Sequence, residues 1–253
     1  MKKSTLSAIK TIRTQLHQLR ISGVGTKNES NRISWLETKL KEIPAGLRIL
    51  DAGAGEQKYK QFCTHLSYVS QDFAKYDGRG DERGLQMGAW DQTKLDIISD
   101  ITSIPEPDNS FDAIMCVEVF EHIPEPLLAI KEFARLLKVN GILIITAPFC
   151  SLTHFSPYHF YTGYNRYFYE KFLPEYGFEI MELKANGNYF EYIAQEIRGL
   201  PEISNCYASA RPSILESLSI RRILKMLQRF SNKDKNSSEL LNHGLHIKAK
   251  LIR

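Results

Sequence analysis

The amino-acid sequence predicts a doubly wound α/β domain built on a mostly parallel, seven-stranded sheet. From Arg48 onward, short apolar runs of strand length alternate with segments of helical periodicity. Such alternation is typical of parallel strands joined by crossover helices, which cover both faces of the sheet. A glycine-containing turn follows the first of these strands, and acidic residues follow several of the others. This pattern predicts a ligand site at the carboxyl edge of the sheet.

Composition limits the classes of protein that fit the chain. Its 253 residues suffice for one domain with an appendage, and 43% hydrophobic and 25% charged residues are typical of globular proteins. The four cysteines lie far apart without a CxxC pair, so we expect neither a zinc site nor a disulfide framework, and we predict no metal site. The net charge of +4 comes from scattered basic residues and gives no strong nucleic-acid signal.

Targeting and membrane signals are not evident in the sequence. No stretch of eighteen or more apolar residues occurs, so we expect no membrane span. The basic N-terminal stretch lacks the apolar core of a secretory signal. Together with the widely spaced cysteines, these features predict a cytoplasmic protein.

Residues 1–46 are predicted to form N-terminal helices. In residues 1–20, Ile and Leu recur at helical spacing with Lys and Arg between them, which favours a helix packed on the domain over one lying on a membrane surface. A second helix is predicted over residues 34–42. Ser34 and Glu37 have the spacing of a capping box at its start.

Residues 47–183 are predicted to form the ligand-binding α/β core. The clearest helix lies at residues 127–137 and is expected to stop at Asn140-Gly141, with a turn into the next strand. The strands of this core are expected at residues 47–50, 68–69, 95–98, 111–117, 141–146 and 178–183.

A helical insertion is predicted over residues 184–241, and residues 242–253 are predicted to supply the final strand of the core sheet. Apolar residues recur at helical spacing from Ile214 to Leu227, and the basic run within them is interpreted as a solvated helix face. The sequence leaves open whether the insertion is a lid over the site or the surface of a homodimer.

The sharpest local signal is RILDAGAG at residues 48–55. An apolar strand ends in Asp51 and leads into Gly53 and Gly55, which permit a tight turn and close approach of the backbone to a ligand. A dinucleotide fingerprint would need a third glycine where Lys58 stands, so an NAD or FAD site is disfavoured. Asp51 would also direct negative charge at a pyrophosphate, and it suits a cationic ligand better.

Acidic residues follow three further strands. Asp72 lies 21 residues after Asp51, near the spacing at which an acid binds a ribose diol, although a surface aspartate fits equally well. Asp100 could accept a hydrogen bond from an adenine amino group while Ile101 packs on the ring. Glu118 follows the fourth strand. The carboxyl ends of parallel strands share one edge of the sheet. Acids at four such ends are therefore much less easily explained by coincidence than an acid at one.

The segment from Arg48 to Pro148 resembles the class I S-adenosylmethionine-dependent methyltransferases, particularly the small-molecule and glycan-type group. It carries LDAGAG, Asp72, SDITSIPEPDNSFDAIMCVEVFEHI and GILIITAPF. The resemblance implies a Rossmann-like methyltransferase fold, S-adenosylmethionine as the cofactor and methyl transfer by in-line displacement. It also implies these contacts: Asp51, Gly53, Ala54 and Gly55 at the methionine part, Asp72 at the ribose, Asp100 and Ile101 at the adenine, and Glu118 on the sulfonium side.

The acceptor side is expected after the fifth strand. Methyl transfer depends mainly on placing the acceptor close to the methyl group, and a base is needed for a hydroxyl or a protonated amine. His154 and His159 lie where an acceptor would approach and are the candidate catalytic bases. His122 is expected to cap or pack the following helix. Seven aromatic residues between positions 155 and 168 form either an acceptor wall, which we favour, or a lid packed on its own core.

The leading hypothesis is methyl transfer to a small-molecule or sugar acceptor. An RNA or protein methyltransferase is less well supported, because no appended nucleic-acid module or dense basic patch is visible. The non-enzymatic alternative is a catalytically inactive, methyltransferase-like binding or scaffold protein, against which the acids at the cofactor positions argue. The residues do not identify the acceptor, since one fold serves many functions.

Overall fold

The computed structural model describes residues 23–253, so the helix predicted over residues 1–20 lies outside the described part. The described chain forms two compact units. The larger comprises Arg32–Ala185 and Gly244–Arg253, and the smaller comprises residues 23–31 and 186–243. Among these residues, none of the helices combines the length and the apolar character that crossing a bilayer requires.

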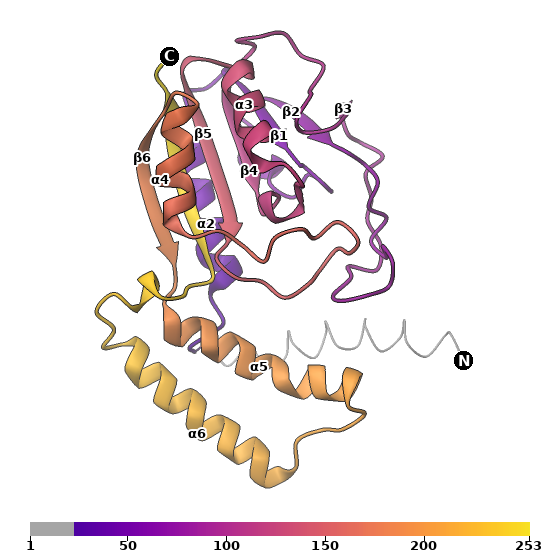
Figure 1. Ribbon diagram of the computed structural model, residues 1–253, viewed down its shortest axis with the longest axis vertical. Helices are drawn as coiled ribbons and strands as arrows, with labels where there is room; N and C mark the ends of the chain where they lie inside the picture. The colour runs from indigo at the N-terminus through magenta and orange to yellow at the C-terminus, as the bar shows by residue number, and fades with distance from the viewer. Residues whose placement is uncertain (1–22) are drawn as a thin grey trace. The chain divides into compact units, whose positions relative to one another are not determined.

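The larger unit is built on a seven-stranded sheet with the strand order β3-β2-β1-β4-β5-β7-β6. Strands β1 to β5 pair in parallel, and β7 runs antiparallel to β5. The prediction of a mostly parallel, doubly wound α/β sheet is therefore confirmed (Figure 1). The strands are β1 Arg48–Ala52, β2 Ser67–Asp72, β3 Ile97–Ile98, β4 Phe111–Val117, β5 Leu137–Pro148, β6 Phe178–Asn186 and β7 Gly244–Leu251.

Both faces of the sheet are buried because the central strands are apolar on both sides. On β4, Ile114 belongs to one core cluster and Met115 to the other. The first cluster receives Phe133 from α3 (Pro126–Leu136) and side chains from α4 (Arg166–Glu175). The second receives Leu36 from α2 (Asn28–Lys41). Alternate strand residues thus face opposite helical layers, as the doubly wound fold requires.

Helix α2 differs from its prediction at the N-terminus. It begins at Asn28, so Ser34 lies inside the helix and its carbonyl accepts a hydrogen bond from Thr38 Oγ1 at 2.8 Å. Glu37 pairs with Lys41, one turn later, at 2.7 Å. The predicted capping box is therefore wrong, because the polar residues before Ser34 are helical.

The junction between α3 and β5 also differs from its prediction. The chain passes directly from Leu136 of the helix to Leu137 of the strand. Along β5 the pairing with β4 shifts register, and Asn140 within the shift has φ of +70°. Asn140-Gly141 is therefore an irregularity inside a strand, and its predicted role as a helix stop is wrong.

The smaller unit contains two long helices, α5 (Tyr189–Tyr207) and α6 (Ile214–Ser231). Ala194 and Leu227, one from each helix, form a small core with Val24. Helix α6 begins with a capping box that Ser213 and Glu216 form. The basic side chains of α6 are exposed, namely Arg221, Arg222, Lys225 and Arg229.

Three short 3-10 helices complete the described chain: η1 Lys60–Phe62, η2 Phe120–His122 and η3 Ser237–Glu239.

Candidate functional site

The turn after β1 is compact because glycine occupies both of its strained positions. Gly53 and Gly55 have φ of +80° and +51°, a region that glycine enters without steric cost. The N–H groups of Gly53 and Ala54 both donate to the carbonyl of Gln71 on β2 at 2.8 Å. A Cβ on Gly53 would lie 2.6 Å from a methyl group of Val119. The turn therefore leaves no room for a side chain at Gly53.

Asp51 lies at the end of β1 and is 1% exposed. Its carboxylate accepts a hydrogen bond from the Tyr68 hydroxyl at 2.6 Å. Burial, together with the nearby Asp72 carboxylate, raises the pKa of Asp51 to about 7, although the hydrogen bond from Tyr68 acts to lower it. A cation beside Asp51 would offset the cost of its buried negative charge.

Asp72 ends β2 and links the glycine turn to the loop that follows. Its carboxylate accepts hydrogen bonds from the N–H of Gly55 at 2.9 Å and the N–H of Ala74 at 3.0 Å. The side-chain amide of Gln92 donates to the same carboxylate at 3.0 Å. Burial raises the pKa of Asp72, and these backbone hydrogen bonds oppose the rise. The structure thus places Asp72 against the glycine turn rather than on an open surface.

The loop over residues 74–94 extends across the glycine turn. The Trp90 ring lies so close to Gly55 that an added Cβ would be 2.6 Å from Cζ2. Trp90 also contacts Phe155 edge-on, with 5.4 Å between ring centroids. Leu85 and His154 form a bridge between this loop and the segment after β5, so the two segments lie side by side (Figure 1).

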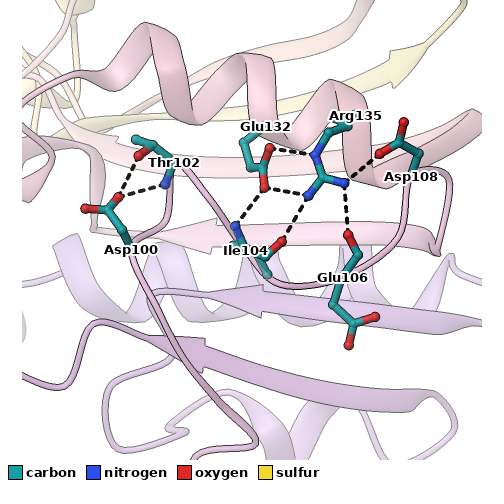
Figure 2. A network of polar contacts seen from close by, with 7 residues as sticks. All are labelled: Asp100, Thr102, Ile104, Glu106, Asp108, Glu132 and Arg135. Carbon is teal, nitrogen blue, oxygen red and sulfur yellow. Dashed lines mark hydrogen bonds and ion pairs between the residues drawn. The ribbon is translucent and has the colours of Figure 1, made fainter.

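Asp100 and Ile101 follow the short strand β3. Asp100 is exposed, and its carboxylate accepts hydrogen bonds from the N–H and the hydroxyl of Thr102 at 2.9 and 2.8 Å (Figure 2). Ile101 is partly buried against the main core cluster. The N–H of Ser99 donates to the carbonyl of Asp72 at 3.1 Å, so the ends of β2 and β3 are joined.

An arginine on α3 holds the segment that follows Asp100. Figure 2 shows the guanidinium of Arg135 bound to Glu132, to Asp108 and to two backbone carbonyls. Glu132 in turn accepts a hydrogen bond from the N–H of Ile104 at 2.7 Å. Glu132 and Asp108 are therefore structural, because their contacts with Arg135 fasten the segment to α3.

Glu118 lies just past β4 with φ of +56°. Its carboxylate accepts a hydrogen bond from the Thr146 hydroxyl at 2.8 Å and pairs with Arg32 of α2 at 3.0 Å. The sequence did not indicate either partner. Arg32 and Thr146 are neighbours of Glu118 only because α2 and β5 flank the end of β4.

The two candidate bases belong to a group of three histidines. The ring centroids of His154 and His159 are 4.8 Å apart, and that of His122 is 4.7 Å from His154. Burial lowers the pKa of His154, but the Glu121 carboxylate outweighs it and the net pKa is raised. For His159, burial and the neighbouring His154 both lower the pKa.

His122 does not cap α3, because the N-cap of that helix is Glu125 and Nε2 of His122 has no hydrogen-bond partner among residues 23–253. Its ring stacks on Phe155 with 5.1 Å between centroids and 12° between the ring planes. Burial lowers the pKa of His122 to about 3, and His154 contributes to the decrease. Sequence reasoning favoured a capping or packing role for His122 over a role as base and did not single out the buried Glu121, although their adjacency in EVFEHI was the available signal.

The aromatic segment after β5 serves partly as packing and partly as surface. Tyr164 is buried, and its hydroxyl donates to the carbonyl of Phe120 at 2.9 Å. Tyr158 packs edge-on against Phe73, with 4.9 Å between centroids. Phe160 is exposed, at 48%. The expected acceptor wall is thus divided between a packed part and an exposed part.

Comparison with known proteins places these features in a family. Residues 50–145 match the model of a methyltransferase domain family. The chain is 29% identical over 121 residues to a ubiquinone biosynthesis O-methyltransferase of Xanthomonas axonopodis, covering 46% of this chain and 48% of the relative. It is 31% identical over 163 residues to a demethylmenaquinone methyltransferase of Renibacterium salmoninarum, covering 63% and 62%. The match spans about half the length of the first of these relatives.

Solved structures share the fold at low identity. A S-adenosylmethionine-dependent methyltransferase from Archaeoglobus fulgidus aligns with a TM-score of 0.51 at 14% identity, covering 86% of this chain and 94% of its own. The [4+2]-cyclase SpnF aligns with a TM-score of 0.53 at 17% identity, covering 90% and 84%. Residues 50–145 thus match a methyltransferase domain, and the described chain has the Rossmann-like fold of solved methyltransferases, with acids around its glycine turn.

Proposed function

We propose that this chain binds S-adenosylmethionine at the carboxyl edge of the sheet and transfers its methyl group to a small-molecule acceptor. The observation that carries the proposal is the placement of acids around one glycine turn. Asp51 is buried at the end of β1, and Asp72 accepts a hydrogen bond from Gly55 of the turn. Glu118 follows the adjacent strand β4.

The chemistry of these residues fits the cofactor. S-adenosylmethionine supplies an electrophilic methyl group on a sulfonium, together with an ammonium group and a ribose diol. Gly53, Ala54 and Gly55 would line the methionine part, where Asp51 offers a buried carboxylate for positive charge. Asp72 would accept the ribose hydroxyls in place of the Gln92 amide that it now binds. Contacts proposed for the other parts are Asp100 and Ile101 at the adenine and Glu118 on the sulfonium side.

His159 is the better of the two candidate bases. Its lowered pKa keeps the ring neutral near pH 7, and a neutral imidazole can accept the proton of an acceptor hydroxyl. Its Nε2 lies 3.2 Å from the Ser151 hydroxyl, which helps to orient the ring. The raised pKa of His154 leaves a smaller fraction of that ring neutral, and so free to accept a proton, at the same pH.

A hydroxylated aromatic ring is the acceptor class that we propose first, with a sugar hydroxyl as the second. Two of the relatives carry names that refer to ubiquinone biosynthesis and to demethylmenaquinone. The exposed ring of Phe160 and the 38% exposed ring of Tyr161 follow His159 and offer faces on which a planar acceptor can stack.

An acceptor screen tests this function. Purified protein is incubated with S-adenosylmethionine carrying a labelled methyl group and, separately, with phenols, catechols, nucleotide sugars, RNA and protein. The products are identified by mass spectrometry. We expect labelled phenolic or catecholic product, with kcat reduced about 10²-fold or more in His159→Gln and little change in the KM for S-adenosylmethionine. Labelling of RNA or protein substrates alone would contradict the proposed acceptor class. Cofactor binding without any transfer would instead favour a non-catalytic binding protein.

A further inference from the structure

A buried carboxylate and two imidazoles converge beside the segment after β5. Glu121 is 1% exposed, and its Oε1 lies 3.7 Å from Nε2 of both His122 and His154. One ligand atom from each of the three residues can be chosen so that all lie within 4.8 Å of one another. Cofactor binding, as proposed above, uses none of these three atoms.

Polar atoms of this cluster lack hydrogen-bond partners. Glu121 Oε2 and His122 Nε2 are buried and have no hydrogen-bond partner among residues 23–253. The distances from Glu121 Oε1 to the two rings exceed that of a hydrogen bond. Leaving a buried carboxylate oxygen unsatisfied is costly, so such a group usually marks a missing water or ion.

The Nδ1 atoms of His122 and His154 determine which ring nitrogen of each imidazole is free to bind a ligand. Nδ1 of His154 lies 2.8 Å from the carbonyl oxygen of Leu152, and Nδ1 of His122 bonds the carbonyl oxygen of Tyr158. Since a carbonyl oxygen only accepts, each Nδ1 must carry the proton. In the neutral rings each Nε2 therefore presents a lone pair toward Glu121. Histidines that bind metals are commonly oriented by such hydrogen bonds to backbone carbonyls.

The backbone holds the three residues in place from both sides. The carbonyl of Glu121 accepts hydrogen bonds from the N–H groups of Phe160 at 2.9 Å and Tyr161 at 3.2 Å. The N–H of His122 donates to the carbonyl of Val119 at 2.8 Å. The segment that carries His154 is thereby fastened to η2, which carries the other two residues.

We propose that Glu121, His122 and His154 form a binding site for one divalent first-row transition metal ion. Metal–ligand bonds of about 2.0 to 2.2 Å separate neighbouring ligand atoms by roughly 3.4 Å. The 3.7 Å from Glu121 Oε1 to Nε2 of each histidine is close to this separation. Two imidazoles and one carboxylate favour Zn²⁺, Fe²⁺, Mn²⁺ or Co²⁺ over Ca²⁺ and Mg²⁺, which prefer oxygen ligands. Three protein ligands leave further coordination positions for water or another small oxygen ligand.

Metal binding by the full-length protein tests the site without any acceptor. After treatment with a chelator, the protein is titrated with Co²⁺ while the visible absorption of the bound ion is followed, and Zn²⁺ uptake is measured by equilibrium dialysis with elemental analysis. We expect one ion per chain, and at least a tenfold loss of affinity in Glu121→Gln and in His154→Gln. The control His65→Gln removes a histidine outside the cluster and should bind as the wild type does.

Two results would overturn the proposal. The first is wild-type protein that shows neither Co²⁺ absorption nor Zn²⁺ uptake at micromolar metal. The second is undiminished binding by both cluster variants. If Glu121→Gln does not fold, His154→Gln decides the outcome, because the side chain of His154 is 23% exposed and less deeply buried than Glu121. Thermal unfolding with and without Zn²⁺ gives a second readout, and only variants with the intact cluster should gain stability.

Discussion

Asp51 and Asp72 lie at the ends of neighbouring parallel strands, yet their carboxylates are held in different ways. Asp72 accepts two backbone N–H groups and an amide, which stabilise its charged form. Asp51 accepts the Tyr68 hydroxyl and is almost fully buried. Asp51 is therefore the acid whose charge most needs a cationic ligand, and its protonation should be visible in the stability of the free protein.

The pH dependence of stability should reveal this buried acid. The pKa of Asp51 rises from 3.8 to about 7 in the folded protein. The protonated carboxyl therefore contributes fully to the stability of the folded state below about pH 4, and this contribution is lost as the pH rises through 7. The ionisable groups that interact with it are Tyr68, Asp72, Cys63 and Cys116. We expect Asp51→Asn to stabilise the protein at pH 8 relative to wild type, by up to a few kcal/mol, and to lose this advantage at pH 4.5.

Urea unfolding of both proteins at the two pH values measures the effect. If the free energy of unfolding changes equally between the two pH values in wild type and in Asp51→Asn, the prediction is contradicted. On the proposed function, the same substitution should weaken S-adenosylmethionine binding, because it removes the carboxylate that we propose to face the cationic cofactor.

Gly53 and Gly46 provide a matched test of the glycine turn. Both have positive φ, +80° and +83°, but a Cβ meets Val119 at 2.6 Å in the first case and nothing within 4 Å in the second. We expect Gly46→Ala to cost about 1 kcal/mol of stability from backbone strain alone. Gly53→Ala should cost clearly more, because strain and steric overlap add. Equal losses in chemical denaturation would show that Val119 moves aside without cost.

At the scale of elements, α3 fixes the segment between β3 and β4. We expect Arg135→Met to destabilise the protein by about 1 to 3 kcal/mol, because it removes hydrogen bonds to Glu132, Asp108 and two backbone carbonyls. The control Lys171→Met removes an exposed ion pair with Glu175 on α4 and should change stability by less than about 0.5 kcal/mol. Thermal unfolding compares the two, and similar values would argue against the structural role of Arg135.

The loop over residues 74–94 should report cofactor binding through its tryptophan. The chain has two tryptophans, Trp35 in the core and Trp90 against Gly55. We expect S-adenosylmethionine to change the tryptophan fluorescence of wild type and of Trp35→Phe but not of Trp90→Phe. A response that persists in Trp90→Phe with unchanged amplitude would mean that the loop does not sense the cofactor.

Element boundaries were less predictable than element types. The strands were visible because apolar runs of strand length are separated by polar residues. The start of α2 was missed because capping residues at Ser34 also fit a helix interior, where Ser34 and Thr38 form a helical contact. The sequence predicts a turn at Asn140 because a turn and a strand bulge share the same signal, a residue that readily adopts positive φ.

At the scale of the whole molecule, the fold and the acids at the strand ends could be predicted because parallel topology brings strand ends to one edge. The grouping of Glu121, His122 and His154 could not. It depends on how the segment after β5 returns to η2 and on which backbone carbonyls its histidines meet. Such contacts are set by tertiary packing between segments that are distant in sequence. No local pattern in the sequence indicates which of these segments will meet.

The central claim is that the carboxyl edge of the sheet binds S-adenosylmethionine through Asp72. Calorimetric titration of wild type, Asp72→Ala and the control Asp108→Ala with S-adenosylmethionine, and separately with NAD, tests it most directly. Asp108 is a suitable control because its side chain is 67% exposed and precedes β4. We predict saturable binding of S-adenosylmethionine and not of NAD by wild type and control, weakened at least tenfold in Asp72→Ala. Well-folded wild-type protein that binds no S-adenosylmethionine, or an Asp72→Ala variant that binds it as tightly as wild type, would contradict the account.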